Sequence, residues 1–116
     1  MSGRKTQNII VGTVVLVALF LLIFGMAFLN EYPNIEIEMS AHTDSKGSDE
    51  YNMTLSDNRA KSVREYILSK GIAAKRITSQ GYGETKPVAP NANDDGTDNP
   101  EGRQLNRRVE FKILKN

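Results

Sequence analysis

The sequence contains no cysteine and no tryptophan, and it has a single histidine, His42. Without cysteine the chain can form neither a disulfide framework nor a thiolate metal site, and it offers no N-terminal cysteine for acylation. Without a second histidine or a cysteine it also lacks the nitrogen and sulfur ligands that a zinc site uses. His42 is therefore expected to have a structural role, and neither a metal nor any other cofactor is predicted.

The chain also lacks a strong excess of charge of either sign. Its formal net charge is +1, and residues 30–116 contain 13 Lys and Arg against 14 Asp and Glu. Domains that bind nucleic acids usually carry a basic face or a basic stripe. The near-neutral balance argues against that class of function, and no nucleic-acid partner is expected.

One long stretch has no ionisable side chain at all. It runs from Ile9 to Leu29 over 21 residues, and as a helix it would extend roughly 31 Å, about the thickness of the hydrocarbon core of a bilayer. Arg4 and Lys5 precede it, and positive charges at this place favour a cytoplasmic N-terminus and export of the residues after Leu29. The run is therefore predicted to be an uncleaved membrane anchor. A cleaved signal peptide and a buried helix of the following domain are the alternatives.

The length of 116 residues allows one small domain and an appendage. We place the hydrophobic leader at residues 1–29 and the domain at residues 30–116. Residues 35–41 alternate between apolar and polar side chains, which is typical of a strand with one buried face. Residues 108–113 alternate in the same way, so a second strand of this kind is predicted close to the end of the chain.

Between these two strands the pattern predicts a helix, a short strand and a long loop. Ser56 is a favourable N-cap, and Lys70-Gly71 supplies a basic last turn and a glycine stop, so the helix is expected to begin after Ser56 and end near Gly71. A strand is expected at residues 76–81, with a glycine-containing turn at 81–84. Residues 85–102 contain three prolines and many polar residues, and they are predicted to form a solvated loop.

Asp44 and Arg59 form the most informative pair of charges. Asp44 comes after the end of the first alternating strand, and Arg59 lies in the first turn of the predicted helix. Two rigidly held opposite charges suit a ligand that carries an ammonium group and a carboxylate on the same carbon. Glycoside hydrolysis would instead need a matched pair of carboxylates, one of them with a raised pKa, and no such pair is evident. We therefore predict a binding protein and not an enzyme.

Five short motifs appear in one order and spacing: Ala41-His42-Thr43-Asp44, Tyr51-Asn52, Leu55-Ser56-x-x-Arg59-Ala60, Gly81-Tyr82-Gly83-Glu84 and Asn106-Arg107-Arg108-Val109-Glu110. With these motifs the chain resembles the OmpA-like C-terminal domain, a peptidoglycan-binding module of bacterial envelopes. The resemblance extends over residues 28–114. It implies an α+β fold of order β-α-β-α-β-β, with helices packed on a small mixed sheet.

The resemblance also implies a ligand and a set of site residues. The ligand would be the stem peptide of peptidoglycan, bound non-covalently, with meso-diaminopimelate as its main recognised part. Asp44 matches the family's aspartate that receives the ammonium group of the ligand. Arg59 matches the arginine that pairs with the carboxylate of the ligand. The other positions that the family places in the pocket are Thr43, Asn52, Leu55 and Arg107.

The chain departs from the family pattern at its N-terminus. The first strand of the family fold is expected to be missing, and the hydrophobic run occupies the place of the first helix. The predicted function is a membrane-tethered module in the periplasm that anchors the envelope to the cell wall. The family is commonly associated with the outer membrane, whereas an uncleaved leader would give an inner-membrane anchor. The alternative function is a structural or assembly subunit of the envelope, with an incomplete domain that does not bind.

Overall fold

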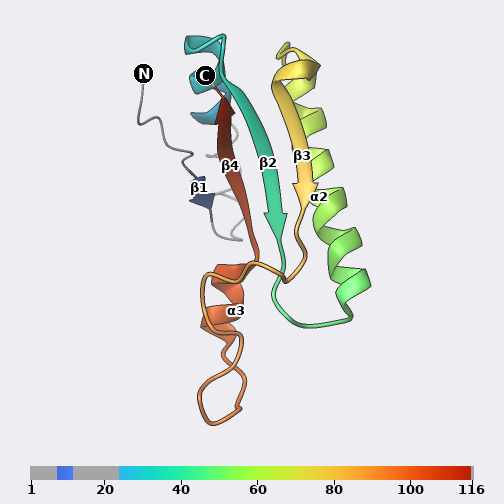
Figure 1. Ribbon diagram of the computed structural model, residues 1–116, viewed down its shortest axis with the longest axis vertical. Coiled ribbons are helices and arrows are strands. Elements are labelled where there is room, and N and C mark those ends of the chain that lie inside the picture. Colours follow the sequence, from blue (N-terminus) through green and yellow to red (C-terminus); the bar gives the residue numbers. More distant parts are fainter. Residues whose placement is uncertain (1–7, 12–23, 116) are drawn as a thin grey trace.

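The computed structural model describes residues 8–11 and 24–115, and its centre is a four-stranded mixed sheet (Figure 1). The strand order is β1-β4-β2-β3. The predicted α+β fold is confirmed, since helices pack on this small sheet, and residues 24–31 are helical as well. The other elements, in chain order, are β1 (Asn8–Val11), β2 (Glu36–His42), α2 (Asp49–Ser69), the 3-10 helix η1 (Ala74–Arg76), β3 (Ile77–Gly81), α3 (Pro100–Asn106) and β4 (Arg108–Lys115).

The core lies between one face of the sheet and the helices. β2 runs parallel to β3 and antiparallel to β4, and in this register Met39 lies opposite Phe111. Because side chains alternate along a strand, Ile37, Met39 and Phe111 share one face. Leu29 from the helical segment and Ile67 from α2 join the same buried cluster. The domain therefore has two layers, with α2 lying along β3 and β2 (Figure 1).

The helical segment 24–31 is an integral part of this core. Leu29 is fully buried, and a Cβ atom on Gly25 would lie only 2.8 Å from the ring of Phe111. The rings of Phe28 and Phe111 meet edge to face, with their centroids 6.1 Å apart. This close packing requires a residue without a side chain at position 25, since a larger one would push the helix away from β4.

Arg76 fastens the end of the helical segment to the start of β2. Its guanidinium donates hydrogen bonds to the carbonyl oxygens of Leu29 at 2.9 Å, Tyr32 at 2.8 Å and Ile35 at 3.0 Å. The last carbonyl groups of a helix have no partners within the helix. One side chain from a distant part of the chain therefore satisfies the end of the helix and the turn after it.

The prediction that the first strand is missing was wrong. Asn8–Val11 forms β1, which pairs antiparallel with β4 and places Ile9 opposite Phe111. All but the first of these residues belong to the apolar run that we assigned to a membrane helix. Isoleucine and valine favour strands and also occur in transmembrane helices. An apolar run by itself therefore does not distinguish a strand from a transmembrane helix.

The rest of the hydrophobic run divides into two parts. Residues 12–23, the middle of the predicted anchor, lie outside the described residues. Residues 24–29 belong to the helical segment that covers the sheet, which is the role of the third alternative, a buried helix of the domain. Within residues 8–11 and 24–115, no helix combines the length and the apolar character that crossing a membrane requires.

α2 begins earlier than predicted, at Asp49, and its N-cap is Ser48. The hydroxyl oxygen of Ser48 accepts a hydrogen bond from the backbone N–H of Tyr51, and Asp49 and Glu50 complement the helix dipole. The first two turns were missed because they lack an apolar stripe. The predicted end of the helix is confirmed, with Lys70 as the C-cap and Gly71 at a φ of 98°.

The predicted loop at residues 85–102 also contains the start of a helix, α3. Asn99 is its N-cap, with a side-chain oxygen that accepts a hydrogen bond from Gly102, and Pro100 occupies the first turn. Both are favourable helix-start signals. The helix was missed because its one large apolar residue, Leu105, is exposed, so there is no apolar periodicity to detect.

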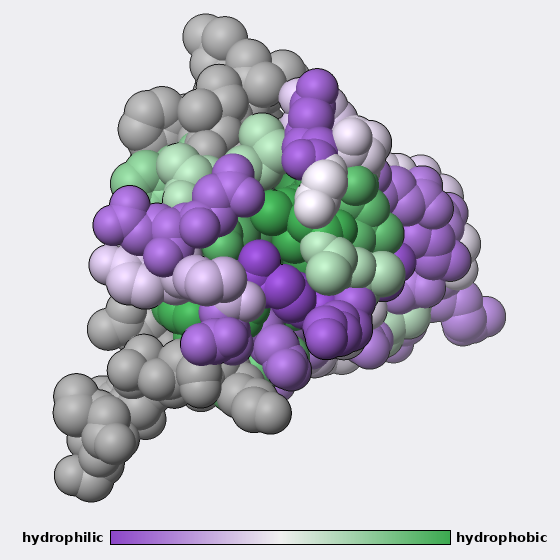
Figure 2. Space-filling model, turned by 90° about the horizontal axis from the view of Figure 1, so that it is seen from above, coloured by the Kyte–Doolittle hydropathy of each residue, from purple (hydrophilic) through white to green (hydrophobic). Residues whose placement is uncertain are grey.

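The two ends of the domain differ in character. Figure 2 views the end opposite to α3, where apolar residues reach the surface inside a frame of polar ones. α3 and the loop before it lie at the other end, beyond the last residue of β2 (Figure 1). The charged residues of the predicted site belong to that second end.

Candidate ligand-binding site

The site is built around the turn at residues 81–84, which is wedged between β2 and α2. The backbone N–H of Thr43 donates to the carbonyl oxygen of Gly83 at 2.8 Å, and the N–H of Gly83 donates to the hydroxyl of Ser56 at 2.9 Å. A Cβ atom on Gly81 would overlap the backbone nitrogen of Asp57. Glycine at position 81 therefore allows α2 to approach the sheet closely at the point where β2 ends.

Asn52 holds the segment after β2 in place. Its side-chain amide is buried and donates to the carbonyl oxygens of Asp44 at 3.3 Å and Lys46 at 2.8 Å, and to Glu84 Oε1 at 2.9 Å. The hydroxyl of Thr43 donates to the carbonyl oxygen of Asp44 at 2.9 Å. Thr43 and Asn52 thus fix the backbone that carries Asp44, and their own side chains are occupied in doing so.

Asp44 is the electrostatic centre of the site. Its side chain is 8% exposed. Oδ1 accepts a hydrogen bond from the N–H of Lys46 at 2.9 Å, while Oδ2 accepts from Arg107 Nη1 at 2.5 Å and Arg103 Nη1 at 3.3 Å. Burial acts to raise the pKa of this carboxyl group, but the hydrogen bonds from Lys46, Arg107 and Arg103 outweigh it and hold the pKa below its ordinary value. Asp44 is therefore ionised throughout the physiological range of pH.

α3 and its C-cap residue bring both arginines to the same carboxylate. Arg103 lies within the helix and Arg107 caps its C-terminus, where the N–H of Arg107 donates to the carbonyl oxygen of Arg103 at 3.2 Å. Asn106 secures the helix, because its buried side chain donates to Ala89 and accepts from the N–H of Val88 and the N–H of Ala89. The side chain of Asn106 therefore connects the end of α3 to the backbone of the loop before it.

Arg103 has a second and closer partner. Its Nε and Nη2 donate to the two carboxylate oxygens of Asp98, both at 2.7 Å, as a bidentate pair. The hydrogen bond from Arg103 holds the pKa of Asp98 below its ordinary value, and the bond to Asp98 raises the pKa of Arg103. The remaining nitrogen, Nη1, is the one that reaches Asp44.

Arg59 and Leu55 lie on a different element from these contacts. Arg59 is exposed, and its side chain makes no hydrogen bond or ion pair with another residue in the part of the chain that the structure describes. Both residues lie on the flank of α2 away from Asp57, whose side chain contacts β3. Helix geometry puts Arg59 about 10 Å along the axis from Asn52. Its guanidinium is therefore available to an external anion.

Four of the six predicted site residues come together in the structure: Asp44, Thr43, Asn52 and Arg107. Among the described residues, neither Arg59 nor Leu55 forms a side-chain hydrogen bond or ion pair with Asp44. The prediction missed Arg103 and Asp98. The spacing of Arg103 and Arg107 was an available signal, since side chains four residues apart lie on the same side of a helix.

A buried polar cluster lies on the other face of the sheet, directly behind the site. His42 is 2% exposed and stacks on Tyr82, with ring centroids 5.3 Å apart. Its Nε2 lies 3.6 Å from Glu110 Oε1, and Glu110 accepts a hydrogen bond from Arg108 Nε at 2.9 Å. Neither ring nitrogen has a hydrogen-bond partner among the described residues. His42 is therefore packed inside the domain, which is consistent with the structural role expected for it, and it lies opposite Arg108 in the register of β2 and β4.

His42 should make the stability of the domain depend on pH. Burial, together with the charges of Arg108 and Lys86, lowers the pKa of His42 to about 4 against the opposing effect of Glu110. The unfolded chain takes up a proton below its ordinary pKa of 6.5, and the folded chain does so only near pH 4. The contribution of neutral His42 to the free energy of unfolding is therefore fully present well above pH 6.5. The free energy of unfolding should fall by about 2 kcal/mol as the pH drops to about 4.5.

The measurement is urea unfolding of the wild type and of His42→Phe, once above pH 6.5 and once at about pH 4.5. Phenylalanine keeps the ring that stacks on Tyr82 and cannot take up a proton, and the carboxylates contribute equally in both proteins. The wild type should lose more stability in acid than the variant. Equal losses would contradict the assignment of the neutral form to His42.

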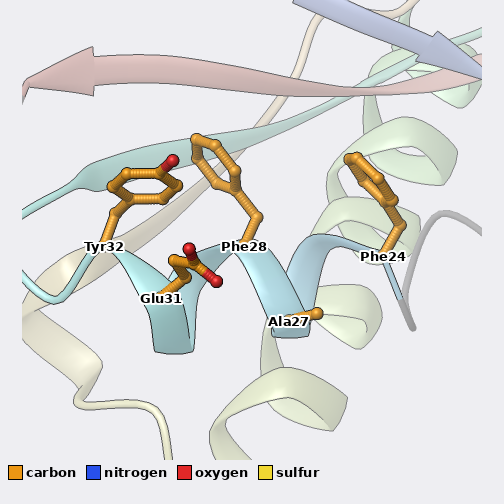
Figure 3. Close-up of a pocket in the computed structure, with 5 residues that line it drawn as sticks. All are labelled: Phe24, Ala27, Phe28, Glu31 and Tyr32. Atoms are coloured by element: carbon orange, nitrogen blue, oxygen red, sulfur yellow. The ribbon is translucent and has the colours of Figure 1, made fainter.

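A groove on the helical segment is separate from this site. It has a volume of about 260 Å³, and Figure 3 shows the five residues that line it, with the rings of Phe28 and Tyr32 side by side: Phe24, Ala27, Phe28, Glu31 and Tyr32. The two rings have centroids 4.9 Å apart. The groove contains one carboxylate and no cation among these residues, so it does not provide the paired charges that the site at α3 provides.

The fold and the charged cluster define a small α+β domain with a candidate binding site at the end of its sheet. The model of the OmpA family matches residues 23–100, and the chain belongs to this family. The resemblance seen in the five motifs is confirmed.

The chain is similar to outer membrane porin F of Pseudomonas fluorescens, with 44% identity over 86 residues, 74% of this chain and 24% of that protein. It is similar to the peptidoglycan-binding protein ArfA of Mycobacterium tuberculosis, with 38% identity over 85 residues, 73% of this chain and 24% of that protein. The chain thus spans about a quarter of the length of either relative.

Among solved structures, the cell wall anchor of the T6SS from Pseudomonas aeruginosa has a TM-score of 0.75 and 25% sequence identity to this chain. The match covers 96% of this chain and 82% of that one.

Proposed function

We propose that the chain is a non-catalytic module of the cell envelope that binds the stem peptide of peptidoglycan through its diaminopimelate residue. One observation carries this proposal: a buried, ionised Asp44 lies at the end of β2, and an exposed, unpaired Arg59 lies on the neighbouring helix. Similarity to a protein named for peptidoglycan binding and to a cell wall anchor supports the choice of ligand.

Each charge has a distinct part in the proposed complex. Arg59 receives the carboxylate of diaminopimelate, because a guanidinium donates to both oxygens of a carboxylate at once. Asp44 receives the ammonium group on the same carbon. Arg107, Leu55 and the backbone around Thr43 and Asn52 form the walls of the pocket.

Tethering to a membrane belongs to the same proposal. Arg4 and Lys5 would remain in the cytoplasm and the domain would face the periplasm. A helix of residues 12–23 would be only about 18 Å long, too short to cross the hydrocarbon core. Membrane insertion would therefore draw residues 24–29 away from the sheet. Release of the full chain from membranes by a carbonate wash would refute the tether.

Two alternatives lack an observation in their favour. The inert structural subunit depended on a missing first strand, and β1 occupies that position. Catalysis would need a pair of carboxylates held at a matched separation, one with a raised pKa, and the shifted carboxyl groups of the described residues, Asp44, Asp95 and Asp98, all have lowered pKa values.

The test is retention of the full chain on purified cell-wall sacculi. Arg59→Ala is expected to reduce retention at least about tenfold, the loss of one charge-assisted contact to a carboxylate. Its unfolding free energy should change by less than about 0.5 kcal/mol, because the side chain is exposed and unpaired. Lys61→Ala is the matched control, since it removes a charge from an exposed position of the same helix.

Free meso-diaminopimelate should also release the wild type from the sacculi. If Arg59→Ala and Lys61→Ala were retained as well as the wild type, the assignment of Arg59 to the ligand would be wrong. If the wild type itself were not retained, the proposed function would be wrong.

A further inference from the structure

The ion pairs around Asp44 raise a question about any cationic ligand. Its Oδ2 already accepts hydrogen bonds from two guanidinium groups, and its Oδ1 accepts one from a backbone N–H. A carboxylate offers about four acceptor positions. An ammonium group that approaches Asp44 must therefore take the last acceptor position beside two positive charges, or one of the guanidinium groups must withdraw.

The two guanidinium groups are not held equally. Arg107 approaches Oδ2 to 2.5 Å, and Asp44 is its only ion-pair partner among the described residues. Arg103 Nη1 lies 3.3 Å from Asp44 Oδ2, and the guanidinium of Arg103 also forms the bidentate pair with Asp98. Withdrawal from Asp44 therefore disturbs Arg103 far less than Arg107, because the two shorter hydrogen bonds from Arg103 to Asp98 remain intact.

We propose that Arg103 competes with the ammonium group of the ligand for Asp44, and that Asp98 sets the strength of this competition. The inference depends on the proposed function, since it concerns the same site. Asp98 keeps two of the donor nitrogens of Arg103 and leaves a single, long contact to Asp44. Without Asp98 the planar fork is free to turn onto Asp44 and form the stronger bidentate pair there.

The two residues therefore have opposite effects on affinity. Arg103→Gln removes the competitor, and the full chain should bind meso-diaminopimelate about threefold to fivefold more tightly, the range of one partly exposed ion pair. Asp98→Asn releases Arg103 onto Asp44 and should weaken binding by a similar factor. The double variant should behave as Arg103→Gln alone, because Asp98 acts only through Arg103.

Titration calorimetry of the full chain in detergent measures these affinities, with meso-diaminopimelate as the probe. Lys75→Gln is the matched control for the loss of one positive charge, since Lys75 is exposed and precedes β3, at the far end of the sheet from Asp44. A second probe is diaminopimelate acetylated on both of its amino groups, which leaves it without an ammonium group. Its binding should be weak and should gain nothing from Arg103→Gln.

The outcomes are distinct from a failure of the proposed function. If the wild type did not bind meso-diaminopimelate, the proposed function would fail and this inference with it. If the wild type bound and Arg103→Gln bound more weakly, Arg103 would support the ligand site and the competition would be disproved. An equal gain for the acetylated probe, or for Lys75→Gln, would also overturn it, because the gain would then be a general effect of charge.

Discussion

Asp44→Ala is expected to abolish retention on cell-wall sacculi and to lower the free energy of unfolding by about 2 kcal/mol, less than the full penalty for breaking a buried ion pair. The loss of stability arises because Arg103 and Arg107 would face each other without the carboxylate between them. The penalty is reduced because their side chains are 17% and 32% exposed, so water can reach them. Thermal unfolding and the sacculus assay measure the two effects separately.

Asp44→Asn is the companion variant, since it keeps the shape of the side chain and an oxygen that accepts from the arginines. It should be more stable than Asp44→Ala and should fail to bind as well, because it lacks the negative charge that the ammonium group needs. Retention of Asp44→Asn at the wild-type level would show that Asp44 only organises the arginines. A loss of binding in Asp44→Ala alone would then be a loss of structure.

The elements with a local signal could be predicted from the sequence. β2 and β4 alternate between apolar and polar side chains because only one face of each strand packs on the apolar core, and the end of α2 carries a glycine stop. The start of α2 and the whole of α3 could not be predicted by periodicity, because they pack on loops and not on the apolar core. Their caps, Ser48 and Asn99, were the signals to weigh more heavily.

The site shows a similar division. The contact between Asp44 and Arg107 joins residues 63 positions apart, and no local pattern brings them together. The family resemblance supplied both residues. Arg103 was not predicted, because its position next to Asp44 depends on α3. The position of α3 depends in turn on the hydrogen bonds of the buried Asn106 side chain.

β1 was missed for a physical reason that also concerns the leader. A strand at the edge of a sheet and a bilayer helix both select apolar, β-branched residues, and the run at residues 9–29 satisfies either. In the structure its first residues form β1 and its last lie in the core beside Phe111. The stability of the domain is therefore coupled to whether this run stays on the sheet.

Phe111→Ala tests that coupling and should have the largest effect on stability. The ring is 1% exposed and contacts both Gly25 and Phe28, so its removal should lower the free energy of unfolding by about 3–5 kcal/mol. Urea unfolding followed by circular dichroism measures the change. Leu114→Ala on the same strand is the control, because Leu114 is 46% exposed and its loss should matter by less than about 0.5 kcal/mol.

A double-mutant cycle with Phe28→Ala then isolates the helical segment. If residues 24–31 pack on β4 in the folded chain, the two aromatic rings should show a coupling energy of about 0.5–1.5 kcal/mol. Independent effects would mean that the segment lies elsewhere, as it would if it entered a membrane. The cycle repeated in lipid vesicles asks which of the two places the segment takes. A coupling that is present in solution and lost in vesicles would show that the bilayer and the sheet compete for the same residues.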